Sequence, residues 1–77
     1  MITVRYFAAA AEAAGRDDEQ IPAGSGDAVR AALLTRHPAL EPILGRCALL
    51  ADGRRVEASD DVPAGATLDV LPPFAGG

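Results

Sequence analysis

The 77-residue sequence lacks lysine and tryptophan entirely and has a single cysteine, Cys47, and a single histidine, His37. One cysteine cannot form an internal disulfide, and a lone thiol fits a reducing compartment. No spacing typical of a zinc site is present, because such a site needs several Cys or His ligands. A Cys47–His37 dyad stays open on sequence distance alone. The apolar surroundings of Cys47 and the helix-end position of His37 favour structural roles for both.

All seven basic residues are arginine, against 11 acidic ones, so the net charge is −4. An acidic chain without a basic run lacks the electrostatic features of a nucleic-acid binder. Two interpretations of the charge remain open. The negative surface meets a basic patch on another protein, or it serves only solubility.

The N-terminus has no basic segment followed by a long apolar run, so we expect no signal peptide, no membrane contact and a cytoplasmic protein. A chain of this length forms one domain with a small core, burying about 60–65% of its unfolded surface. The segment AGSGDA, residues 23–28, lacks the lysine of a phosphate-binding loop and is interpreted as a loop entering a helix. Asp17, Asp18 and Glu19 are interpreted as a solvated turn.

Alternation of β-branched and aromatic residues predicts a strand at 2–8, with Ile2, Val4 and Tyr6 on one face. Residues 9–15 predict a short helical turn ended by Gly15. A short edge strand is expected at 19–21, stopped by Pro22.

Residues 24–38 predict the main helix, with Asp27 as a candidate N-cap and Val29 and Leu33 on its apolar side. Pro38 cannot continue the helix. Residues 40–44 are expected to form a turn whose apolar side chains enter the core.

Asp52-Gly53 between apolar segments predicts a hairpin within 46–58, and a turn around Pro63 leads to a last strand at 67–71. One main helix and a mixed sheet predict a two-layer α+β domain over residues 1–71.

The sequence ends in Pro72-Pro73-Phe74-Ala75-Gly76-Gly77. Pro72 and Pro73 each fix one φ angle and favour an extended course, and the six residues of this flexible tail reach roughly 20 Å. Glycine has no Cβ, so Gly76 and Gly77 can enter a channel too narrow for any side chain. We therefore expect the active site of another protein to act on the Gly77 carboxylate. A binding module with an accidental Gly-Gly ending is the alternative.

Phe7 and Leu71 are apolar residues on the otherwise polar faces of the first and last strands. If these strands are neighbours, the two side chains form one exposed patch beside the tail, and Phe74 extends it. Such a patch is typical of a protein interface.

These segments, from MITVRYFA through DAVRAALLTRHP, DGRRV and PAGATLDVLPP to the final PPFAGG, resemble the ubiquitin-like sulfur carriers over essentially the whole chain. The sequence is most similar to the small subunits of molybdopterin synthase, which share the Pro-Pro-x-x-Gly-Gly ending. The resemblance implies a β-grasp fold, with a mixed sheet packed on one main helix.

The resemblance also implies a function without catalysis by this chain alone and without a bound cofactor or metal. A ubiquitin-activator-like adenylyltransferase would use ATP and Mg²⁺ to adenylate Gly77, and a persulfide donor protein would convert it to a thiocarboxylate. The tail, residues 72–76, would enter the large subunit of molybdopterin synthase, with Phe7 and Leu71 contacting partners. There the sulfur would build the dithiolene of molybdopterin.

Two alternatives remain within the resemblance. One is a sulfur carrier for thiamine thiazole or cysteine synthesis, and the other is a ubiquitin-like protein modifier. Because the chain has no lysine, it cannot accept an isopeptide bond on its own side chains.

Overall fold

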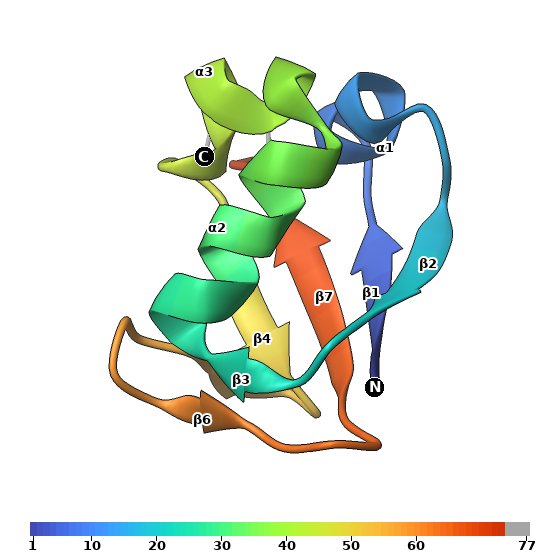
Figure 1. Ribbon diagram of the computed structural model, residues 1–77. Coiled ribbons are helices and arrows are strands. Elements are labelled where there is room, and N and C mark those ends of the chain that lie inside the picture. Colours follow the sequence, from blue (N-terminus) through green and yellow to red (C-terminus); the bar gives the residue numbers. More distant parts are fainter. Residues whose placement is uncertain (74–77) are drawn as a thin grey trace.

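The computed structural model describes residues 1–73 and contains a helical layer packed on a sheet (Figure 1). In chain order the elements are β1 (Ile2–Tyr6), α1 (Ala9–Ala14), β2 (Asp18–Ile21), β3 (Gly24–Ser25), α2 (Gly26–Arg36), the 3₁₀ helix η1 (Pro38–Leu40), α3 (Glu41–Leu44), β4 (Ala48–Ala51), β5 (Arg54–Arg55), β6 (Asp61–Val62) and β7 (Thr67–Leu71). None of the helices in this part of the chain is long and apolar enough to cross a membrane.

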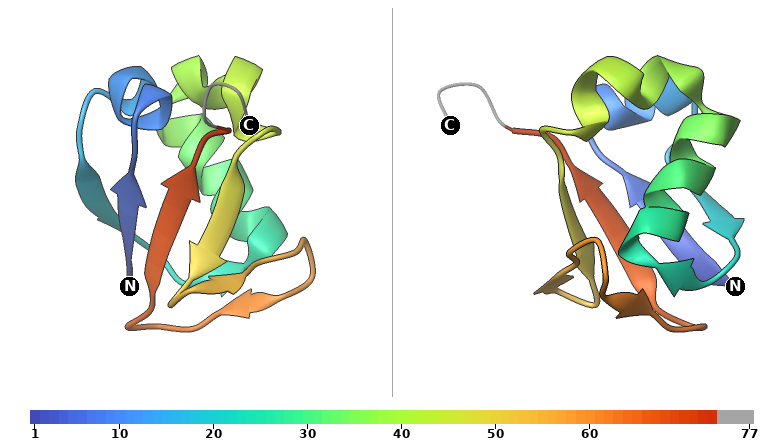
Figure 2. Two further views of the ribbon diagram at one scale, coloured as in Figure 1. Left: turned by 180° about the vertical axis from the view of Figure 1, so that it is seen from behind. Right: turned by 60° about the vertical axis from the view of Figure 1, so that its left-hand side comes forward.

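The main sheet has five strands in the order β2-β1-β7-β4-β5. The central strands β1 and β7 run parallel, while β2, β4 and β5 are antiparallel to their neighbours. The helices lie on one side of this sheet, and its other side is open (Figure 2). The expected mixed sheet packed on one main helix is confirmed.

Alternate side chains of the central strands form the core beneath α2. Ile2, Val4 and Tyr6 of β1 are buried, as their shared face predicts, and Val29 and Leu33 of α2 pack against them. The expected turn at 40–44 is wrong in its geometry, because η1 and α3 make the segment helical. Pro42 stands in the first turn of α3, where its missing N–H costs no hydrogen bond, and Leu40 and Leu44 enter the core as expected.

The N-cap of α2 is Ser25, so the expectation of Asp27 is wrong. The Ser25 hydroxyl accepts a hydrogen bond from the backbone N–H of Ala28 at 3.1 Å. The first residue of the helix is Gly26, and glycine is needed there because a Cβ would lie 2.2 Å from the backbone oxygen of Glu57. Asp27 lies instead in the first turn, where its charge interacts favourably with the helix dipole.

The turns follow the local sequence. Asp52 and Gly53 have φ angles of 49° and 83°, as the predicted hairpin between β4 and β5 requires. Gly65 has a φ of 90° in the turn before β7. The second sheet, in which β3 pairs with β6, was not expected from the sequence.

Candidate functional site

The open face of the main sheet carries the residues that alternate with the core positions. The register places Arg5 of β1 beside Asp69 of β7, and Asp69 beside Leu50 of β4. Leu71, two residues after Asp69 and therefore on the same face of β7, lies opposite Ala48. No helix lies on this face of the sheet in the views from behind and from the side (Figure 2).

Phe7 and Leu71 lie at the carboxyl ends of neighbouring strands. The backbone N–H of Phe7 donates to the carbonyl of Val70 at 3.3 Å, which extends the parallel pairing of β1 and β7 by one residue. Both side chains are half-buried. The adjacency expected from the sequence is therefore present, and we call Phe7 and Leu71 the terminal patch. Its role in partner binding stays a prediction.

An ion pair lies next to the terminal patch. The Arg5 guanidinium donates to the Asp69 carboxylate through Nε at 2.7 Å and a terminal nitrogen at 3.0 Å. It also lies 5.6 Å from the centroid of the Phe7 ring. The hydrogen bond to Asp69, together with the negative charge of the Asp69 carboxylate, raises the pKa of Arg5 above its ordinary value. This bidentate pair holds the guanidinium against the aromatic ring.

The last strand leads directly toward the predicted tail. Pro72 is buried and Pro73 is exposed. Phe74, Ala75, Gly76 and Gly77 lie outside the described residues. The structure thus places the base of the tail beside the terminal patch, at the carboxyl end of β7.

A buried acidic cluster was missed in the sequence, and the expectation that Glu19 belongs to a solvated turn is wrong. The Glu19 side chain is 5% exposed. Its carboxylate accepts hydrogen bonds from the Tyr6 hydroxyl at 2.5 Å and from Nε2 of His37. Arg36 and Arg16 approach the same carboxylate at 3.4 and 3.7 Å. The sequence signal that could have revealed the inward position of Glu19 was the alternation of side chains along β2, where Asp18 and Gln20 point outward on either side of it.

The cluster keeps Glu19 ionised. Burial acts to raise the pKa of this carboxyl, but the hydrogen bonds from Tyr6 and His37 and the nearby positive charges outweigh burial and lower it. Because the partners come from β1 and the end of α2, the cluster connects the edge strand β2 to the rest of the domain. Its geometry is that of a structural network.

His37 and Cys47 both have structural environments. The His37 ring contacts Tyr6 edge to face, with centroids 5.6 Å apart, in addition to its bond with Glu19. Cys47 is buried, and its thiol donates to the carbonyl of Ile43 at 3.4 Å. Burial raises the pKa of the Cys47 thiol, which disfavours the nucleophilic thiolate. Among residues 1–73 no group of three His, Cys, Asp or Glu side chains is placed to hold a metal ion.

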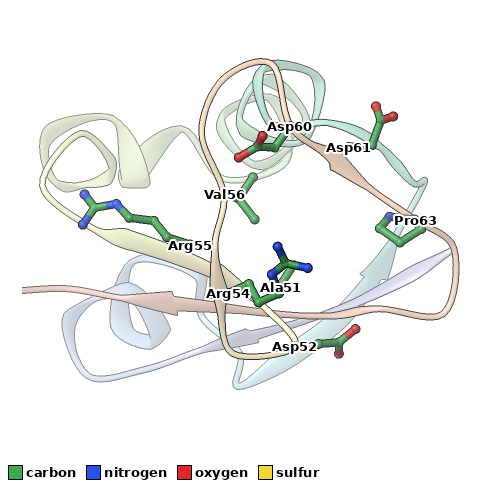
Figure 3. A pocket seen from close by; sticks show the side chains of 8 residues that line it. All are labelled: Ala51, Asp52, Arg54, Arg55, Val56, Asp60, Asp61 and Pro63. Carbon is green, nitrogen blue, oxygen red and sulfur yellow. The ribbon is translucent and has the colours of Figure 1, made fainter.

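A pocket of about 300 Å³ lies at the hairpin end of the sheet (Figure 3). The Asp52 carboxylate accepts the backbone N–H of Thr67 at 3.0 Å, and the Asp60 carboxylate accepts that of Glu57 at 2.8 Å. Arg55 extends away from the other labelled side chains (Figure 3). These carboxylates stabilise turns. The pocket is also remote from the terminal patch, because β7 starts near Asp52 and ends at Leu71.

Comparison with known families decides the relationship. The ThiS family profile matches residues 4–77. The chain belongs to the ThiS family. The resemblance to ubiquitin-like sulfur carriers is therefore confirmed at the level of the family, although comparison with curated protein sequences gives no significant match.

Solved structures agree with this family assignment. The small archaeal modifier protein SAMP1 from Haloferax volcanii is 30% identical, with a TM-score of 0.78 over 99% of this chain and 98% of its own. One chain of the protein-protein complex of subunits 1 and 2 of the molybdopterin-converting factor from Helicobacter pylori is 25% identical. Its TM-score is 0.73, over 99% of this chain and 97% of its own. A Pyrococcus furiosus protein, proposed to be molybdopterin converting factor subunit 1, is 23% identical, with a TM-score of 0.83 over 95% and 97%. The β-grasp fold of this ThiS-family chain is thus confirmed.

Proposed function

We propose that this ThiS-family protein is a sulfur carrier whose Gly77 carboxylate is converted to a thiocarboxylate, which supplies sulfur for the dithiolene of molybdopterin. The observation that carries the proposal is the family match, which runs through Gly76-Gly77. The half-buried terminal patch at the base of the tail supports it. A cytoplasmic location fits both a thiocarboxylate and an unpaired cysteine.

The chemistry follows from the weakness of a carboxylate as an electrophile. Attack of the Gly77 carboxylate on ATP, with Mg²⁺ on the activating enzyme, forms an acyl-adenylate and releases pyrophosphate. The outer sulfur of a protein persulfide then attacks the acyl carbon and expels AMP. A second thiol attacks the donor's cysteine sulfur in the resulting acyl disulfide, forms a disulfide with the donor and expels the thiocarboxylate of Gly77. The anionic sulfur is then a nucleophile, like the thiolate of an activated cysteine.

The residues of this chain position the sulfur. Gly76 and Gly77 leave room for a narrow channel, because they carry no Cβ. Pro72 and Pro73 restrict the backbone where the tail leaves the domain. The terminal patch, Phe7 with Leu71, supplies an apolar contact surface beside that point. Tethered delivery raises the local concentration of the sulfur at the acceptor.

The partners in this proposal are three proteins. A ubiquitin-activator-like adenylyltransferase activates Gly77, and a persulfide protein donates sulfur. The large subunit of molybdopterin synthase receives the tail. The two chains together form a sulfurtransferase, in which the acid and base groups belong to the large subunit. The Helicobacter pylori structure, a complex of subunits 1 and 2 of a molybdopterin-converting factor, supports this third partner.

A second candidate function is protein modification. The 30% identity to a small archaeal modifier protein over nearly the full length of both chains favours it. It predicts conjugates of higher mass in cell extracts, joined through Gly77 to lysines of other proteins. A carrier for thiamine thiazole or cysteine synthesis is distinguished by which acceptor enzyme takes the sulfur from the loaded chain.

The test compares tail variants for sulfur loading. Deletion of Gly77, or extension beyond it, is expected to abolish loading by the activating enzyme, ATP and persulfide donor, because the reacting carboxylate is lost or displaced. Gly76→Ala is expected to reduce loading strongly through steric exclusion. Circular dichroism should show an unchanged fold, and an N-terminal extension of equal length serves as the control. Normal loading of the Gly77 deletion would refute the proposal.

A further inference from the structure

The open face continues beyond Phe7 into a cavity on the β2 side. Its volume is about 370 Å³. Phe7, Ala8 and Ala11 contribute apolar surface, and Asp17 and Asp18 are its acidic residues. Because Phe7 belongs to both, the cavity and the terminal patch form one continuous surface.

The negative charge of the cavity is only partly compensated within the described residues, because one cation, Arg5, lies across from Asp18 in the strand register and pairs with Asp69. Arg5 also lines it, but its guanidinium is held by the bidentate pair with Asp69. Arg16, the next candidate, donates to the backbone carbonyl of Asp18 and approaches Glu19. Asp17 and Asp18 are exposed, and within residues 1–73 neither carboxylate has an ion-pair partner. Two carboxylates without an ion-pair partner in residues 1–73 therefore line the cavity together with an apolar wall of Phe7, Ala8 and Ala11.

The backbone at this wall is strained. Ala8 has a φ of 50° and a ψ of −124°, which non-glycine residues rarely adopt. Such conformations persist where the surrounding structure fixes them, and they concentrate at functional sites. Here Ala8 joins β1 to α1 and lines the cavity between them.

We propose that the cavity receives one arginine or lysine side chain from the protein that docks on the open sheet face. This inference rests on the proposed function for the docking itself and adds the chemistry of the partner. The two carboxylates complement a single cationic head group, and the volume suits one long side chain. The aliphatic stem packs on Ala8 and Ala11, beside the Phe7 ring that the Arg5 guanidinium already contacts. Charge complementarity at such a position also speeds association and excludes partners with an acidic group there.

The pocket at the hairpin end lacks this combination. Two of its three carboxylates, those of Asp52 and Asp60, already accept backbone N–H groups, and two arginines, Arg54 and Arg55, line it together with Asp61. It therefore provides an internal comparison on the same molecule.

The experiment is an NMR titration of the full chain with acetyl-Gly-Arg-Gly-amide, using the citrulline peptide as a neutral isostere. We expect shifts of the Phe7, Ala8, Ala11, Asp17 and Asp18 amides with the arginine peptide and none with citrulline. The double variant Asp17→Asn/Asp18→Asn should bind about tenfold more weakly, as expected for two partly exposed ion pairs. The control Asp27→Asn/Asp61→Asn removes the same charge elsewhere and should bind like the wild type.

Equal effects in the two double variants, or shifts distributed over all surface carboxylates, would overturn the proposal. A response that persists with citrulline would also do so, because the cation would then be irrelevant. The chain lacking Gly77 should retain the full arginine response. A chain that binds the peptide but never carries sulfur would therefore refute the proposed function and leave the cavity assignment intact.

Discussion

Glu19 shows how one inward-facing charge is accommodated in a small domain. A buried carboxylate is unfavourable unless donors replace water, and here Tyr6, His37 and Arg36 replace it. The lowered pKa means that Glu19 binds a proton less readily in the folded chain than in the unfolded chain. Its contribution to stability is thus fully present above pH 4.5, which is the ordinary pKa of the carboxyl. The contribution is lost as the pH falls through the lower pKa of the folded state.

Glu19→Gln is expected to lower the free energy of unfolding at neutral pH by about 1–3 kcal/mol, because charged hydrogen bonds inside the domain are weakened. The difference from the wild type should shrink as the pH falls below 4.5. Urea unfolding at both pH values measures this. Glu57→Gln, at an exposed position paired with Arg55, is the control and should have little effect. A pH-independent loss in Glu19→Gln would argue against the ionised cluster.

The terminal patch is the second feature at this scale. Phe7→Ala and Leu71→Ala are each expected to weaken binding to the activating enzyme or large subunit by about 1–2 kcal/mol, as for interface anchors. Calorimetric titration with the purified partner gives the affinity. Leu34→Ala removes a half-buried side chain from the helical layer and should leave the affinity unchanged. Equal losses in all three variants would indicate a general effect on folding and remove the patch from the interface.

At the scale of elements, local signals were sufficient where local geometry decides the structure. The Asp52-Gly53 pair predicted the hairpin between β4 and β5 because these residue types tolerate positive φ angles, and both residues adopt them. Alternation predicted β1 and its core face. The β3–β6 pairing was not predictable, because each strand has two residues and the partners are distant in sequence. Glu19 escaped prediction because its neutralising partners come from β1 and α2, which the sequence of β2 does not reveal.

The start of α2 gives a prediction for this scale. Ser25→Ala should destabilise the protein by about 0.5–2 kcal/mol, because the N–H of Ala28 loses its acceptor. Asp27→Ala should cost less, about 0.3–1 kcal/mol, since only the dipole interaction is lost. Thermal or urea unfolding of the two variants compares them directly. A larger loss in Asp27→Ala would show that Asp27, as the sequence indicated, is the true cap.

At the scale of the whole molecule, the proposed functional features gather at one end. The terminal patch, the acidic cavity and the base of the tail all lie where β1 and β7 end. The sequence predicted the adjacency of Phe7 and Leu71, because both are apolar residues on polar faces, while the role of the Gly-Gly ending stays a prediction. The sequence did not predict the cavity, which forms only when β2 and α1 approach Phe7. In our proposal, the chain thus provides both a docking face and the reacting carboxylate.

The most direct test is the intact mass of the untagged chain, purified from its own cells without added reductant. We predict a fraction heavier by the difference between one sulfur and one oxygen atom, with the difference mapped to Gly77 by fragmentation. Treatment with the activating enzyme, ATP and the persulfide donor should increase that fraction. A chain that keeps its unmodified mass after this treatment would contradict the account.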